Sequence, residues 1–211
     1  LIMIIISLLL LGYSISFALS TTMRYDEAYS YLYYGKTLDG FSNLSLANNH
    51  PLNSFLIYLS SYFFPYNDFM IRLPNIIFLI LYLFFSMKIS NNTRIKLLTF
   101  GMLTLYWYLI PDFFTQARGY GIASSIVLIF LYQFLNKPCT NRTILILIAV
   151  LLVGSYTFLG LVPLIVSVSI YYLIFEIARP IGFIKKNLLA VLGLCSGLIY
   201  IIRMLISVSL E

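Results

Sequence analysis

Long apolar runs alternate with short polar connections along almost the whole chain of 211 residues. A helix of about 20 apolar residues crosses the roughly 30 Å hydrocarbon core of a bilayer. The pattern predicts about seven transmembrane helices, over 1–19, 69–87, 95–111, 119–136, 143–159, 161–178 and 187–208. Backbone polar groups must be satisfied inside lipid, and the runs lack the alternation of a membrane barrel. We therefore expect an all-α polytopic bundle that forms a single transmembrane module over 1–211.

The connection between the first two predicted spans, residues 20–68, is long and contains amphipathic elements of its own. Tyrosines and leucines alternate with polar residues over 27–38, which predicts a helix lying at the membrane interface. A turn-rich stretch follows over 40–49. The apolar segment 54–64 is too short to span a bilayer, and it predicts a second interfacial or re-entrant helix.

Composition and charge agree with a membrane location. Hydrophobic residues make up 61% of the chain and charged residues 9%, and the mean hydropathy is +0.96, which excludes an ordinary soluble domain. The net charge of +6 does not indicate a nucleic-acid partner, because 8 of the 13 basic residues flank three alternate connections: Lys88, Arg94, Lys96, Lys137, Arg142, Arg179, Lys185 and Lys186. Basic connections of this kind are typical of the cytoplasmic face. The opposite connections carry acids, namely Asp26, Glu27, Asp39, Asp68 and Asp112.

The first span, the cysteines and the residue composition each bear on where the protein is located. Span 1–19 lacks a small-x-small cleavage site before Arg24 and precedes further spans, so we interpret it as an anchor and not as a signal peptide. The chain starts inside an apolar run without Met, and we expect a piece of a longer multi-pass protein. Cys139 and Cys195 should lie at different depths, so no disulfide is predicted. The Ile-, Tyr-, Phe- and Asn-rich composition favours a bacterial inner or plasma membrane over the endoplasmic reticulum, where the sequon at Asn43 would matter.

Ionisable residues at a membrane boundary are candidates for function. The adjacent acids Asp26 and Glu27 follow the first span, His50 stands in NNHPLNS, and Asp112 and Arg118 stand in PDFFTQARGYG. The charge-based topology places all five on the same face, where this set suits group transfer. A carboxylate can deprotonate an acceptor, and a second can orient it or hold a divalent metal. An arginine can stabilise a phosphate leaving group through paired hydrogen bonds.

The same residues have structural explanations that the sequence leaves open. Arg118 could simply snorkel, with its charged group at the membrane–water interface, or it could pair with Asp112. His50, directly before a proline, could be a loop residue with its hydrogen bonds satisfied. Asp68 and Arg72 are four residues apart at the start of a span, and we expect them to form a local ion pair.

Four segments, taken in order, resemble a known family. They are MRYDEAYSYLYYG (23–35), NNHPLNSFLIYLSSYFFPYNDFMIRLPNIIF (48–78), PDFFTQARGYGIAS (111–124) and, more weakly, SYTFLG (155–160). The chain resembles multi-span glycosyltransferases of the GT-C fold, in particular the group of protein O-mannosyltransferases and the lipid A aminoarabinose transferase (glycosyltransferase family 39-like), over roughly residues 1–180. The family's His-Pro position commonly carries a second Pro, which is Leu52 here.

The resemblance implies an inverting transfer of sugar from a polyprenyl-phosphate-linked donor to a protein, glycan or lipid acceptor on the extracytoplasmic face. The expected catalytic residues are Asp26, Glu27 and Asp112, and the expected substrate-binding residues are His50, Arg118, Tyr120 and Arg203. Arg203 lies inside the last predicted span and could instead snorkel toward the interface. No His/Cys cluster demands a metal or other cofactor, although carboxylate oxygens could be assembled around a divalent ion.

Two other functions fit the same pattern. A transporter or flippase of a lipid-linked substrate would use the external acids and Arg203 as a route, although transporters place ionisable residues near the midplane. A non-catalytic membrane subunit would pack against partner helices through small residues such as Gly193 and Gly197.

Overall fold

The computed structural model describes residues 1–37, 50–64, 67–105, 109–136, 141–158, 161, 164–168 and 202. The regular elements in these residues are all helical. They are α1 (Ile2–Ser20), α2 (Tyr25–Ser30), the π-helical turn η1 (Tyr31–Gly35), α4 (Pro51–Phe63), α5 (Asp68–Asn91), α6 (Lys96–Thr104), α7 (Leu109–Phe113), α8 (Tyr120–Asn136) and α9 (Asn141–Ser155). The predicted all-α class is thereby confirmed for the described part of the chain.

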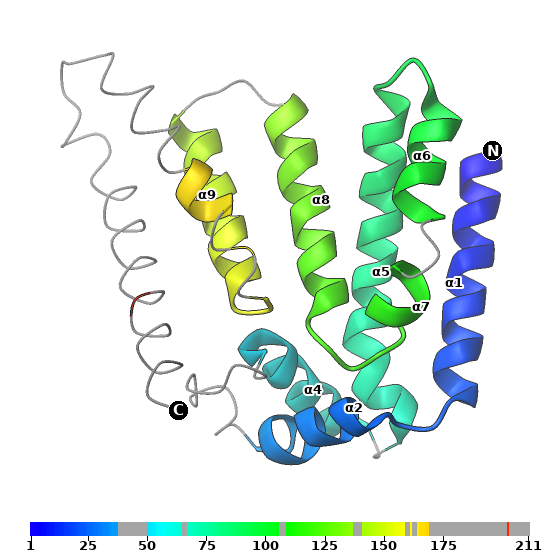
Figure 1. The fold of residues 1–211 in the computed structure, drawn as a ribbon, viewed down its shortest axis with the longest axis vertical. Coiled ribbons are helices and arrows are strands. Elements are labelled where there is room, and N and C mark those ends of the chain that lie inside the picture. The colour runs from blue at the N-terminus through cyan, green and yellow to red at the C-terminus, as the bar shows by residue number, and fades with distance from the viewer. Residues whose placement is uncertain are drawn as a thin grey trace.

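Helix α5 is the centre of the bundle. It packs against α1 on one side and α8 on the other, and it also contacts α4 and α6, while α9 packs on the far side of α8 (Figure 1). A cluster of buried apolar side chains joins α5 to α8 and to the α7 region; its buried members are Leu79, Tyr82, Leu83, Ile110, Phe114 and Leu128. The position of α5 makes it the scaffold on which the neighbouring helices are arranged.

Two of the described helices, α1 and α5, are long and apolar enough to cross a membrane. The other apolar helices of the described part are shorter, over Tyr120–Asn136 and Ile146–Ser155. Helix α1 also exposes large apolar side chains along its length, and Leu8 and Leu9 are 64% and 67% exposed. An apolar surface of this extent is unfavourable in water and is typical of contact with lipid or with a partner protein.

The predicted spans differ from the observed helices in one important place. Residues 95–111 do not form a single helix, because α6 ends at Thr104 and α7 begins separately at Leu109. The predicted spans 69–87, 119–136 and 143–159 correspond to α5, α8 and α9 with shifted ends. The spans predicted at 161–178 and 187–208 lie almost entirely outside the described residues, and so does the turn-rich stretch at 40–49.

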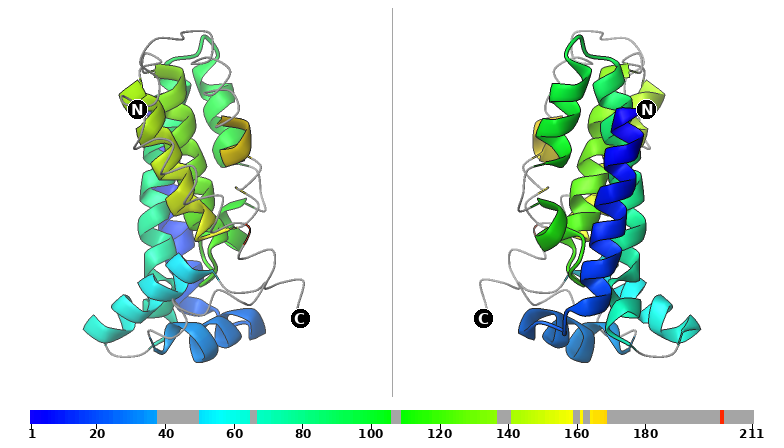
Figure 2. Two further views of the ribbon diagram at one scale, coloured as in Figure 1. Left: turned by 90° about the vertical axis from the view of Figure 1, so that its left-hand side faces the viewer. Right: turned by 90° about the vertical axis from the view of Figure 1, so that its right-hand side faces the viewer.

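Short helices α2 and α4 cross one end of the bundle, the lower end in Figure 1, beside the C-terminus of α1 and the N-terminus of α5 (Figures 1 and 2). Helix α2 begins at Tyr25 and becomes π-helical at Tyr31, so the predicted helix over 27–38 is shorter and less regular than expected. Helix α4 begins at Pro51, three residues before the prediction, because proline fits the first position of a helix without losing a hydrogen bond. The turn η1, which continues α2, packs against α4.

Candidate functional site

A buried ion pair lies within the lower end of the bundle. The guanidinium of Arg72 in α5 contacts both carboxylate oxygens of Glu27 in α2, with Nε to Oε1 and Nη2 to Oε2 distances of 2.8 Å each. The two side chains are 1% and 0% exposed. Two parallel charge-assisted hydrogen bonds are the strong geometry for such a pair. The pair therefore fixes α2 onto α5.

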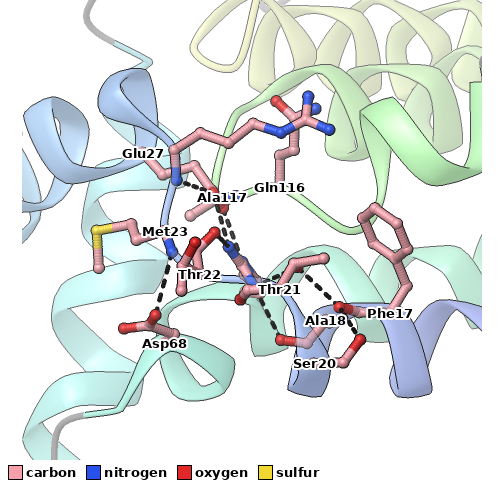
Figure 3. Close-up of polar contacts among 12 residues, drawn as sticks. Phe17, Ala18, Ser20, Thr21, Thr22, Met23, Glu27, Asp68, Gln116 and Ala117 are labelled. Atoms are coloured by element: carbon pink, nitrogen blue, oxygen red, sulfur yellow. Dashed lines mark hydrogen bonds and ion pairs between the residues drawn. The ribbon is translucent and has the colours of Figure 1, made fainter.

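The remaining donors of Arg72 bind backbone carbonyls at the end of α1, on residues that Figure 3 labels. Its Nη1 donates to the carbonyl oxygens of Ala18 and Thr21 at 2.8 Å, and its Nη2 donates to that of Thr22 at 3.1 Å. The last carbonyls of a helix lack partners within the helix and carry partial negative charge, so they suit a cation. Arg72 thus joins α1, α2 and α5 at one point.

The predicted local pair between Asp68 and Arg72 is wrong. Asp68 instead accepts a hydrogen bond from the backbone N–H of Met23 at 3.1 Å, and Arg72 turns to Glu27, 45 residues away in sequence. A local pair on a helix surface contributes only about 0.2–0.5 kcal/mol. This contribution is smaller than that of a buried site in which the guanidinium binds a carboxylate and three backbone carbonyls.

Glu27 also holds the turn between α7 and α8. Its Oε1 accepts from the N–H of Ala117 at 2.8 Å, and its Oε2 accepts from the N–H of Arg24 at 2.9 Å. The other side of the same turn is bound from α4, where Asn53 donates to the carbonyl of Ala117 at 3.0 Å and accepts from Asn75 of α5 at 3.0 Å. These contacts hold the turn against three helices.

The protonation of Glu27 follows from these contacts. Burial alone raises the pKa of this carboxyl, but the hydrogen bonds from Arg72 and from two backbone N–H groups, with the charge of Arg72, hold its pKa below the ordinary value. The carboxylate is therefore charged at neutral pH. Its oxygens accept four hydrogen bonds from protein groups, which is the geometry of a structural ion pair and leaves little capacity to take a proton from a substrate.

A second, more exposed ion pair lies directly beside the buried one. Arg118 Nη1 is 2.8 Å from Asp26 Oδ2, and the two side chains are 16% and 58% exposed. Asp26 precedes Glu27 in α2, and Arg118 follows Ala117 in the turn, so the contact between Glu27 and Ala117 sets the register in which the exposed pair meets. The Arg118 guanidinium also lies over the ring of Tyr120, 5.1 Å from its centre.

Asp112 has a different partner from the one that the sequence suggests. It does not form its ion pair with Arg118; Arg24 Nη1 lies 3.4 Å from Asp112 Oδ1, and Gln116 Nε2 donates to the same oxygen at 3.2 Å. The side chains of Arg24 and Asp112 are 53% and 39% exposed, so this pair is weak and solvated. Both ion pairs nevertheless connect the α1–α2 segment to the α7–α8 segment.

His50 occupies the start of α4 and is 7% exposed. Its Nδ1 donates to the carbonyl oxygen of Thr157 at 2.6 Å, and its ring packs edge-to-face on Tyr120 with centres 5.2 Å apart. Burial and, to a smaller extent, the charge of Arg118 lower the pKa of His50 to about 4, although the hydrogen bond to Thr157 acts in the opposite direction. The imidazole is therefore neutral at pH 7.

Gly119 allows this close arrangement. A Cβ at this position would lie 2.3 Å from the carbonyl oxygen of Thr157 and 3.1 Å from His50. The neighbouring backbone is joined as well, because the N–H of Leu52 donates to the carbonyl of Tyr156 at 3.0 Å. The segment after α9 therefore meets both the start of α4 and the turn before α8.

The predicted convergence thus holds for most of the candidate residues. Asp26, Glu27, His50, Asp112, Arg118 and Tyr120 lie in one connected set of contacts at the lower end of the bundle. Arg203 lies outside the described residues. Among the residues that the structure describes, no three His, Cys, Asp or Glu side chains are placed to hold a metal ion.

Sequence reasoning missed several members of this set. Arg24, Asn53 and Thr157 gave no chemical signal, because each acts through its position next to another segment. Arg72 carried a signal, since it is a charged residue inside the predicted span 69–87, where ionisable residues are rare.

No protein-family model, curated protein or solved structure matches this chain. The resemblance to GT-C enzymes therefore rests on the four sequence segments. The structure brings parts of all four together, through Glu27, His50, Arg118 and Thr157.

Proposed function

We propose that the protein is a multi-pass membrane glycosyltransferase that takes sugar from a polyprenyl-phosphate-linked donor and acts on the extracytoplasmic face. The observation that carries this proposal is the exposed pair of Asp26 and Arg118. A carboxylate and a guanidinium from segments 92 residues apart meet beside the ends of two membrane-length apolar helices, where a lipid phosphate and a water-borne acceptor would both arrive.

The chemistry assigns one group to each charge. Arg118 binds the donor phosphate through paired hydrogen bonds. Asp26 takes the proton of the acceptor hydroxyl as its oxygen attacks the anomeric carbon. The bond between that carbon and the phosphate oxygen breaks, and its electron pair leaves with polyprenyl phosphate. Attack opposite the leaving group inverts the anomeric configuration.

The other charged residues support this pair. Glu27 and Arg72 position Asp26 and Arg118. Glu27 directly follows Asp26, and its carboxylate binds Arg72 and the N–H of Ala117, the residue before Arg118. Asp112, partly exposed and paired with Arg24, is the second carboxylate that can orient the acceptor. The ring of Tyr120 stabilises the guanidinium of Arg118 through a cation–π contact.

A transporter fits the observations less well. The charged side chains among the described residues lie at the ends of the apolar helices, with the acids and Arg72 near the start of α5 and Lys88 near its end. A substrate route through the membrane requires ionisable groups near the middle of the spans.

The proposal is tested with the full-length protein reconstituted in lipid and a panel of labelled polyprenyl-phosphate sugars. Asp26→Asn is expected to lower turnover by about 10²–10⁴-fold, the usual contribution of a general base. Asp68→Asn is the matched control, because Asp68 lies at the same end and, among the described residues, accepts its side-chain hydrogen bond from the backbone N–H of Met23 and not from an arginine. Wild-type turnover in Asp26→Asn, or no transfer by the wild-type protein from any donor of the panel, would refute the proposal.

A further inference from the structure

The ring of His50 has one nitrogen that is bound and one that is not. Its Nδ1 is 2.6 Å from the carbonyl oxygen of Thr157, whereas its Nε2 is buried and has no hydrogen-bond partner among the residues that the structure describes. A buried polar atom without a partner is costly, and in a native protein it usually marks a water or ligand position. The unbound nitrogen is therefore the feature to explain.

The bound nitrogen determines what the other can do. A carbonyl oxygen only accepts hydrogen bonds, so Nδ1 must carry the hydrogen. In the neutral ring, Nε2 then has a lone pair and no hydrogen, and it can only accept. The depressed pKa of His50, about 4, keeps the ring in this state at pH 7.

A donor without a partner lies on the same aromatic ring. Arg118 Nε is buried and makes no hydrogen bond within the described part of the chain, although Nη1 of the same side chain binds Asp26. Both Arg118 and His50 contact the ring of Tyr120, with distances of 5.1 and 5.2 Å to its centre. The ring of Tyr120 is thus contacted by one side chain with an unused donor and by another with an unused acceptor.

The chemistry of the ligand follows by elimination. A metal ion or ammonium group at Nε2 would be repelled by the nearby Arg118 charge. A phosphodiester has no hydrogen to donate, so its oxygens would face a lone pair. A neutral hydroxyl donates to Nε2 and still accepts from Arg118 or from water.

We propose that Nε2 of His50 accepts a hydrogen bond from a hydroxyl of the sugar that is attached to the donor phosphate. The inference rests on the proposed function. The sugar is chosen over the acceptor because the phosphate-binding group, Arg118, shares the Tyr120 ring with His50. Access requires a neighbouring side chain to move, and Phe158, 38% exposed with its ring 5.4 Å from that of Tyr120, is the most exposed ring of this cluster.

Two substitutions separate the two nitrogens. In His50→Asn the side-chain amide can occupy the place of Nδ1 and keep the hydrogen bond to Thr157, but no atom replaces Nε2. In His50→Gln the amide reaches the place of Nε2 instead. The binding of two probes is measured with the reconstituted full-length protein: polyprenyl phosphate without sugar, and the polyprenyl-phosphate sugar that the wild type transfers.

The expected result is selective. His50→Asn weakens binding of the sugar-bearing donor about tenfold, as expected for one unmade hydrogen bond, and leaves binding of sugar-free polyprenyl phosphate unchanged. His50→Gln retains part of the sugar-dependent binding. One mono-deoxy donor should also bind the wild type about tenfold more weakly than the parent donor but bind His50→Asn as well as the parent does.

Equal loss for both probes in His50→Asn, or no loss for either, overturns this inference and leaves the proposed function standing. If the wild type binds neither probe, the proposed function itself fails and the inference falls with it. The two failures are therefore distinguishable in one set of measurements.

Discussion

Replacing Glu27 by Gln tests whether the buried ion pair holds the lower end of the bundle together. The carboxylate accepts four hydrogen bonds, two from Arg72 and one each from the N–H groups of Arg24 and Ala117. The amide keeps one oxygen acceptor and turns two hydrogens toward groups that are themselves donors. It also leaves the guanidinium of Arg72, 1% exposed, without a counter-charge. Breaking a buried pair in this way costs about 3–5 kcal/mol.

The measurement is thermal unfolding of the purified protein in one detergent or nanodisc preparation. For a chain of 211 residues, a loss of this size lowers the melting temperature by about 10 °C. Asp26→Asn is the matched control. It removes the same charge one residue along the chain, but Asp26 belongs to the exposed pair with Arg118, and its side chain is 58% exposed. A pair at such an exposure contributes at most about 1 kcal/mol.

Equal melting temperatures for Glu27→Gln and Asp26→Asn would refute the reasoning, because the buried and the exposed ion pair would then contribute equally to stability. Arg72→Lys gives a second test. It keeps the positive charge but cannot reproduce the two parallel contacts to Glu27 together with the three carbonyl contacts at the end of α1, so a clear loss is expected there too. Full stability in Arg72→Lys would show that charge alone, without geometry, is sufficient.

Three further outcomes are expected. Gly119→Ala places a Cβ 2.3 Å from a carbonyl oxygen and should lower stability by about 1–3 kcal/mol in a thermal-shift assay, whereas Gly12→Ala, with open space around it, should be neutral or slightly stabilising. The unfolded chain protonates His50 near pH 6.5 and the folded protein only near pH 4, so stability should fall by about 3 kcal/mol as pH falls through this window, and His50→Asn should flatten that part of the pH–stability curve. Asp26→Asn should tighten binding of polyprenyl phosphate about two- to fivefold while turnover falls, because the carboxylate no longer competes with the phosphate for its arginine; weaker binding would show that the two do not share that arginine.

The helices of the bundle could be predicted where the sequence marks their ends. Asn67 caps α5 by accepting from the N–H of Met70 at 2.9 Å, and Pro51 begins α4; both are residue types with a local preference for these positions. The break between α6 and α7 has no comparable signal. Residues 95–111 are mostly apolar, and apolar periodicity alone does not show where a helix stops.

The candidate site could be predicted in membership but not in pairing. The residue types and the predicted topology were enough to group Asp26, His50, Asp112 and Arg118. The partner of each charge depends on how α1, α2 and α5 cross, and no local pattern carries that information. Arg72 illustrates the point, because its nearest acid in sequence, Asp68, is not the acid that it binds.

The buried pair has a consequence for how the chain is made. Glu27 leaves the ribosome 45 residues before Arg72, so its carboxylate must stay hydrated until α5 has been synthesised. In the proposed membrane location, the carbonyls at the C-terminus of the first hydrophobic segment also stay hydrated until the same guanidinium has been synthesised. In that location, the final packing of the first hydrophobic segment depends on the second, because a nascent chain that ends before Arg72 leaves Glu27 without its counter-charge.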